Sequence, residues 1–170
     1  MATREDVVMR SASLRSAVEA GDHAAMVETL APDVVFHGPV ISTPFEGREQ
    51  VGLLFDALLA NFADIRYTGQ LASADAEVLA FTARVGKRQV EGMDLLRFDE
   101  HGRIREFRVA IRPLSALAAV AEAVGPQLAR PQGRGRAAIV RMFARSLSAM
   151  TALGDAASSR LVKPGAARDL

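Results

Sequence analysis

An alternation of apolar and polar residues between positions 65 and 113 constrains the fold more than any other feature of the sequence. Three short polar segments, residues 73–75, 86–88 and 99–102, interrupt it. Side chains two apart in a strand share a face, so the alternation predicts half-buried strands, and the interruptions have the composition of hairpin turns. The sequence therefore predicts four consecutive strands in an antiparallel meander.

Two helical segments are predicted near the N-terminus. Residues 4–20 carry apolar side chains at roughly helical spacing between charged ones. Asp22 has the position of an N-cap for a second helix over residues 23–31, which Pro32 is expected to end. Two short helices are thus expected to precede the first strand.

A strand and a third helix complete the region before the meander. Residues 33–39 are β-branched and aromatic, as in a strand. Residues 48–62 place apolar side chains three and four positions apart, which predicts an amphipathic helix. Helices followed by an antiparallel meander predict an α+β fold, with the helices on one face of a curved sheet.

The region after Pro113 is expected to be a helical extension. Residues 114–125 are alanine-rich and predict a short helix, residues 126–136 have the proline, glycine and arginine content of a linker, and residues 137–156 predict a further helix. That last helix could close a pocket, pack across a dimer or lie on a membrane surface. We expect packing on its own domain or on a sister subunit, because apolar stripes usually face cores. The stripe consists of Ile139, Phe143, Leu147 and Met150.

Composition excludes several classes of function. The chain of 170 residues has a net charge of +1, so nothing in it demands nucleic acid or an anionic membrane as a partner. It has no cysteine, and its three histidines lack ligand-like spacing, so we expect no metal and no cofactor. A signal peptide and an apolar stretch of membrane-spanning length are both missing, so a cytoplasmic protein without membrane association is expected.

Asp94 breaks the apolar pattern of the third meander strand. Strand parity puts it on the same face as Leu96 and Phe98, opposite to Arg97. A carboxyl group buried among apolar side chains without a partner has a raised pKa, stays protonated and can donate a hydrogen bond. Such acids are common in catalytic sites. The alternative is that Asp94 pairs with a nearby arginine or caps a bulge.

His37 is a second candidate. It follows Phe36 at the end of the first strand, and a histidine there can serve as a general base with a pKa near neutrality. The alternative is a half-exposed histidine at a strand end without a catalytic role. The phenylalanines of the chain fit an ordinary core as well as the lining of a pocket.

Three segments together resemble a known family. They are EAGDHAAMVETLAPDVVF, GPVISTPFEGREQ and above all MDLLRFDEHGRI, and they resemble the nuclear transport factor 2-like superfamily, in its branch of ketosteroid isomerases and SnoaL-like polyketide cyclases. The resemblance covers about residues 5–113. It implies a SnoaL-like domain over residues 1–125, followed by a linker and helical extension over residues 126–170.

The resemblance implies a cystatin-like α+β barrel: a cone-shaped, strongly curved antiparallel sheet packed against three N-terminal helices around an apolar pocket. Asp94 matches the protonated aspartic acid that ketosteroid isomerases use to stabilise an oxyanion. The expected partner is a hydrophobic small molecule. The residues expected to bind it, besides the candidate catalytic residues Asp94 and His37, are Leu14, Val18, Phe36, Phe55, Phe81, Leu96, Phe98, Phe107, Val109 and Ile111.

Other catalytic positions of the family do not match. Gly38 stands where ketosteroid isomerases have their general-base aspartate, and Leu14 where they have a tyrosine, so the known steroid isomerisation is not expected. The limonene-epoxide-hydrolase pattern also fails, because Val109 occupies the position of its second acid.

Three hypotheses follow. The chain is an isomerase, cyclase or hydrolase that uses Asp94 as acid or base, a non-catalytic binder of a hydrophobic metabolite, or a dimerisation module. Relatives commonly dimerise through the outer face of the sheet, so the resemblance implies a homodimer under all three.

Overall fold

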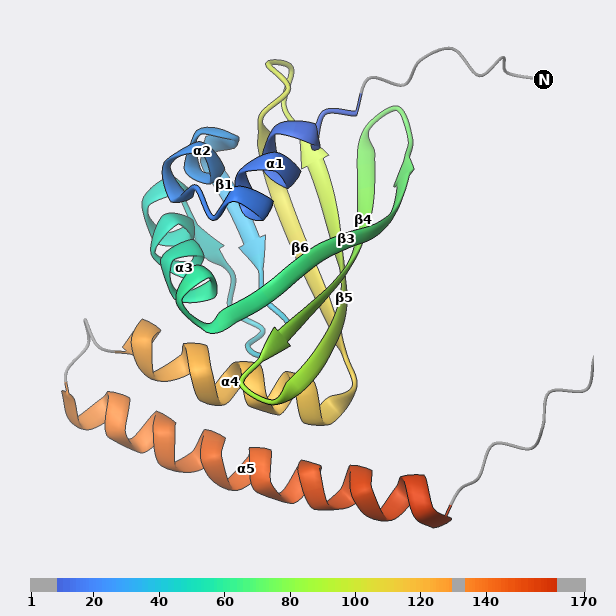
Figure 1. Cartoon of the computed structure of the whole chain (residues 1–170). Helices are drawn as coiled ribbons and strands as arrows, with labels where there is room; N and C mark the ends of the chain where they lie inside the picture. The colour runs from blue at the N-terminus through green and yellow to red at the C-terminus, as the bar shows by residue number, and fades with distance from the viewer. Residues whose placement is uncertain (1–8, 130–133, 162–170) are drawn as a thin grey trace, which may run out of the picture.

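The computed structural model describes residues 9–129 and 134–161, which form a curved six-stranded sheet with helices on its concave side and across one end (Figure 1). The elements in chain order are α1 (Ala12–Ala20), α2 (His23–Glu28), β1 (Leu30–His37), β2 (Phe45–Glu46), α3 (Arg48–Asn61), β3 (Phe62–Ala72), β4 (Ala76–Val85), β5 (Arg88–Phe98), β6 (Ile104–Arg112), α4 (Leu114–Ala129) and α5 (Arg134–Leu161).

The predicted meander is confirmed. Strands β3 to β6 pair antiparallel in sequence order, and the three turns lie at the three interruptions of the alternation. The sheet order is β2-β1-β6-β5-β4-β3, and β1 pairs with β6 in parallel, so the sheet is mixed rather than wholly antiparallel. A parallel pair needs a long connection, and here α3 and the rest of the meander lie between the two strands.

The predicted N-terminal helices form, with shifted bounds. The Asp22 carboxylate caps α2 by accepting a hydrogen bond of 3.0 Å from the backbone N–H of Ala25, as expected. The first helix begins at Ala12, and residues 4–8 of the expected helix lie outside the described part of the chain. Pro32 does not end α2. It lies within β1, where the pairing with β6 is irregular between Leu30 and Val35, and a proline is tolerated at such an irregularity.

The C-terminal region is more helical than expected. Helix α4 passes through Pro126 to Ala129 and α5 begins at Arg134, so the predicted linker over 126–136 is wrong at both ends, while residues 130–133 are not described. Helix α4 crosses the end of the sheet where β5 begins, and α5 runs along the outer side of α4 (Figure 1). No helix among the described residues is long and apolar enough to cross a membrane.

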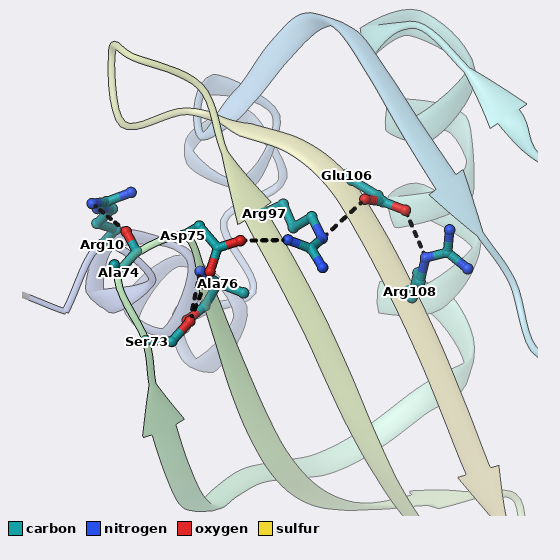
Figure 2. A network of polar contacts seen from close by, with 8 residues as sticks. All are labelled: Arg10, Ser73, Ala74, Asp75, Ala76, Arg97, Glu106 and Arg108. Carbon is teal, nitrogen blue, oxygen red and sulfur yellow. Dashed lines mark hydrogen bonds and ion pairs between the residues drawn. The ribbon is translucent and has the colours of Figure 1, made fainter.

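One end and the outer face of the sheet carry polar contacts. At the end opposite α4, the backbone N–H of Arg10 donates a hydrogen bond of 2.7 Å to the buried carboxylate of Glu77, which also accepts from Ser11 at the start of α1. On the outer face, Arg97 bridges Asp75 at 2.7 Å and Glu106 at 3.4 Å (Figure 2). The ion pairs of Arg97 therefore lie on the face of the sheet that is turned away from the helices.

Candidate functional site

A cavity of about 770 Å³ lies between the concave face of the sheet and the helices. Helices α1, α2 and α3 form one wall, strands β3 to β6 the opposite wall, and α4 with α5 the end of the cone. The volume is in the range of pockets that take small organic molecules. Eight of the ten residues expected to bind a ligand line it, namely Leu14, Val18, Phe36, Phe55, Phe81, Phe107, Val109 and Ile111.

Asp94 also lines this cavity. It lies in the middle of β5, opposite Leu79 on β4 and Val109 on β6, and is only 5 % exposed. Among the described residues its carboxyl group has no hydrogen-bond or ion-pair partner. Burial raises its pKa from 3.8 to about 8, so the protonated form dominates at neutral pH.

The two alternative interpretations of Asp94 are wrong. No described arginine pairs with it, because Arg97, its nearest arginine in β5, points to the outer face and binds Asp75 and Glu106. Pairing of β5 with both neighbouring strands is regular at Asp94, and the carboxyl group accepts no hydrogen bond from the irregularity between Arg97 and Phe98, so the residue does not cap a bulge. The inward direction deduced from strand parity is confirmed.

Tyr67 is a second polar group of the cavity, and the sequence reasoning missed it. It lies on β3 directly opposite Phe81, whose ring meets the Tyr67 ring edge-on at 6.4 Å between centroids. The Arg15 guanidinium lies 5.5 Å from the Tyr67 ring centroid. Burial, and then the charge of Asp94, raise the pKa of Tyr67 above its ordinary value. Its signal in the sequence is that it is the single tyrosine of the chain and alternates with Ile65 in β3.

Gly92 fixes the wall beside Asp94. A Cβ atom at this position would lie 2.3 Å from the Cζ atom of the Phe81 ring and 2.8 Å from the backbone oxygen of Ala110. Only a residue without a side chain lets the Phe81 ring lie across β5. The Phe81 ring thereby fills the space between Tyr67 and β5, and it keeps this part of the cavity wall apolar.

Three residues expected in the site lie outside the cavity. His37 has the opposite parity to Phe36 and points to the outer face, where its Nε2 atom is 3.6 Å from a carboxylate oxygen of Glu106. Leu96 and Phe98 face inward as expected, but they lie farther along β5, at the end that α1 covers. Leu96 and Phe98 belong to the hydrophobic core at that end of the sheet. The prediction that these two residues and His37 lie in the site is therefore wrong.

The extension contributes a part of the cavity that the sequence reasoning did not assign. Val120, Val124 and Leu128 of α4 line its end, and so do Ile139, Phe143, Ala144 and Leu147 of α5. Of the three roles considered for the last helix, closing a pocket is the one that this contact fits. The predicted packing of the apolar stripe on its own domain is only partial, because most of these side chains remain half exposed or more.

The site has few chemical groups. Asp94 and Tyr67 are the only ionisable side chains among the described residues that line it, and both carry a proton at neutral pH. Gly38 lines the cavity where the resemblance implies a general base, and it has no side chain to serve as one. No group of three or more histidine, cysteine or carboxylate side chains in the described ranges is arranged to hold a metal ion. The arrangement offers two hydroxyl donors in an apolar enclosure.

Comparison with known proteins agrees with this geometry. Residues 12–107 match the model of the SnoaL-like domain. A steroid delta-isomerase from Pseudomonas aeruginosa is 38 % identical, with a TM-score of 0.67 over 72 % of this chain and 91 % of its own. An uncharacterised protein with a cystatin-like fold from Silicibacter pomeroyi is 26 % identical, with a TM-score of 0.68 over 80 % of this chain and 94 % of its own.

A more distant neighbour shares the fold alone. The epoxide hydrolase/cyclase-like enzyme SalBIII, which acts in pyran ring formation in the polyether salinomycin, is 20 % identical, with a TM-score of 0.54 over 61 % of this chain and 88 % of its own. No curated protein matches the sequence. The family match over more than half of the chain and the α+β architecture agree, and the chain therefore belongs to the SnoaL-like family of the nuclear transport factor 2-like superfamily.

Proposed function

We propose that the protein takes an apolar small molecule with one oxygen-bearing end into the cavity, and that Asp94 acts on that end as an acid or base. The observation that carries the proposal is a carboxyl group with no partner inside an apolar enclosure. An unpartnered buried carboxyl is costly for the fold, and a hydrogen bond to a ligand would offset that cost.

The two protonation states of Asp94 define the chemistry. The neutral form donates a hydrogen bond to a carbonyl or epoxide oxygen and stabilises negative charge that develops there. The ionised form, which grows as the pH approaches about 8, is a stronger base than an ordinary carboxylate and accepts a proton from the carbon beside a carbonyl. Isomerisation, cyclisation and hydrolysis at an epoxide all use such steps, and the similar steroid delta-isomerase supports the first.

A second candidate function is binding without turnover. Gly38 and Leu14 favour it, because neither can supply the second proton-transfer group that the resemblance implies at these positions. Under this hypothesis Asp94 and Tyr67 hold the polar end of a hydrophobic metabolite and no bond is broken.

Exchange of the α-protons of decalone in deuterated water, followed by NMR, tests the proposal. We expect the wild type to accelerate exchange by about 100-fold or more over Asp94→Asn, since acid–base groups contribute on that order. The amide of Asp94→Asn keeps a donor, so decalone affinity should change little. Binding without exchange leaves the non-catalytic function, whereas absence of binding by decalone and by apolar epoxides contradicts both functions.

We also propose a homodimer formed through the outer face of the sheet. Met93 is 57 % exposed there although it lies in the centre of β5, on the same face of the strand as Arg97. Sedimentation equilibrium of the wild type and Met93→Glu would measure it: the wild type is expected at twice the monomer mass and the variant at the monomer mass. A monomeric wild type contradicts the proposal.

A further inference from the structure

Helix α5 lies outside the part of the chain that matches the SnoaL-like domain, and yet it lines the cavity. The match ends at residue 107, whereas Ile139, Phe143 and Leu147 belong to the lining. These three residues are four positions apart, so they form one stripe along the helix. The cavity of this chain therefore includes a wall that the family domain itself does not provide.

The stripe is apolar but not covered by protein. Ile139 is 54 %, Phe143 68 % and Leu147 49 % exposed, although all three border the cavity. The neighbouring Ala144 is buried against α4, so the helix is seated and its exposed stripe does not result from detachment. Near its other end, the hydroxyl of Ser115 on α4 donates a hydrogen bond to the Asp155 carboxylate. Helix α5 is thus held against α4, while its apolar stripe remains exposed to solvent.

We propose that α5 is the outer wall of the ligand pocket, and that the apolar tail of an elongated ligand covers Ile139, Phe143 and Leu147. The proposal rests on the proposed function, because it places the oxygen-bearing end of the same ligand at Asp94. Apart from Tyr67 and Asp94, all described lining side chains are apolar, so the tail carries no charge. The ligand class is a ketone with a long, uncharged alkyl tail.

Two observations make the ligand tail the occupant of the stripe. The stripe is continuous with the cavity, since the same three side chains are both exposed and part of its lining. The cavity volume of about 770 Å³ lies in the upper part of the usual range for small-molecule pockets, so a short ligand would leave apolar space empty. A ligand that extends to α5 fills this space and removes the exposed stripe from water.

A series of straight-chain methyl ketones, from a propyl to an undecyl tail, tests the proposal by calorimetric titration. For the wild type we expect affinity to rise up to about fourfold for each methylene that is buried, through the longest tails. In Phe143→Ala the rise should stop once the tail reaches α5, with a loss of about tenfold for the longest ketone and none for the shortest. Leu147→Ala should behave alike.

Met142→Ala is the matched control. Met142 is 60 % exposed on the same helix but does not line the cavity, so its replacement should leave the whole series unchanged. Equal affinities of Phe143→Ala and Met142→Ala for every ketone would overturn the inference. A wild-type ketone affinity that does not fall as the pH rises past about 8 would instead contradict the hydrogen bond to Asp94 in the proposed function, so the two failures are distinct. Circular dichroism should show the same helix content in all variants, because the replaced side chains are exposed.

Discussion

Replacing Asp94 by asparagine should make the protein more stable at neutral pH, and the gain should grow with pH. In the folded chain burial raises the pKa of Asp94 from 3.8 to about 8, whereas in the unfolded chain the carboxyl has its ordinary pKa. Between these two values the unfolded chain is ionised and the folded chain is protonated, so folding takes up a proton. The unfolding free energy of the wild type is therefore highest below the unfolded-state pKa of Asp94, and it falls as the pH rises towards the folded-state pKa.

The magnitude follows from the size of the shift. Each pH unit between the two pKa values costs about 1.4 kcal/mol, so a shift of about four units corresponds to about 6 kcal/mol at alkaline pH and to about 4 kcal/mol at neutral pH. Asparagine is close in size and does not ionise. The free-energy cost of burying the asparagine amide does not depend on pH. It therefore shifts the difference in unfolding free energy by a constant and leaves its slope against pH unchanged.

Urea unfolding of both proteins at several pH values between about 5 and 7, where the folded chain keeps the proton and the unfolded chain does not, measures the effect. The difference in unfolding free energy between Asp94→Asn and the wild type should increase by about 1.4 kcal/mol per pH unit. All other ionisable groups are common to both proteins, so their contributions cancel in the difference. A difference that stays constant with pH would show that Asp94 titrates near its ordinary pKa, and the argument from burial would be refuted.

Three further variants test other parts of the structure. Gly92→Ala should lower the unfolding free energy by about 1–3 kcal/mol in urea titrations, because its Cβ would meet the Phe81 ring and a backbone oxygen; an unchanged value would contradict that close packing. Glu77→Ala should lower the unfolding free energy by about 3 kcal/mol and lower the Tm, since it leaves the backbone N–H groups of Arg10 and Ser11 without their acceptor; a neutral effect would contradict this role. Gly38→Asp should speed α-proton exchange of decalone by about 100-fold, by adding a base to the lining, and an unchanged rate would place this position out of reach of the ligand.

Local sequence patterns predict some of the strand pairings in the sheet and not others. The period of two defines β3 to β6 and their turns, because each strand buries one face and hairpins pair neighbours. The parallel pairing of β1 with β6 joins segments far apart in the chain, and no local pattern encodes it. The same holds for Pro32, which reads as a helix terminator in sequence but is tolerated at an irregularity of the pairing.

For the cavity, too, the sequence predicts some features and not others. Sequence parity alone turned Asp94 inward, and it also turned Leu96 and Phe98 inward, but parity gives the face of a strand and not the depth along it. Position along the cone depends on which helix covers which end, so Leu96 and Phe98 belong to the core beneath α1.

The strand order of the meander, the three N-terminal helices and one inward-facing acid follow from periodicity and residue chemistry, so they could be predicted before folding was considered. Three other features could not: His37 faces outward beside Glu106, Tyr67 shares the cavity with Asp94, and α5 borders it. These features depend on contacts between segments distant in sequence. The free energy of such contacts comes from packing and burial, which exist only once the chain has folded.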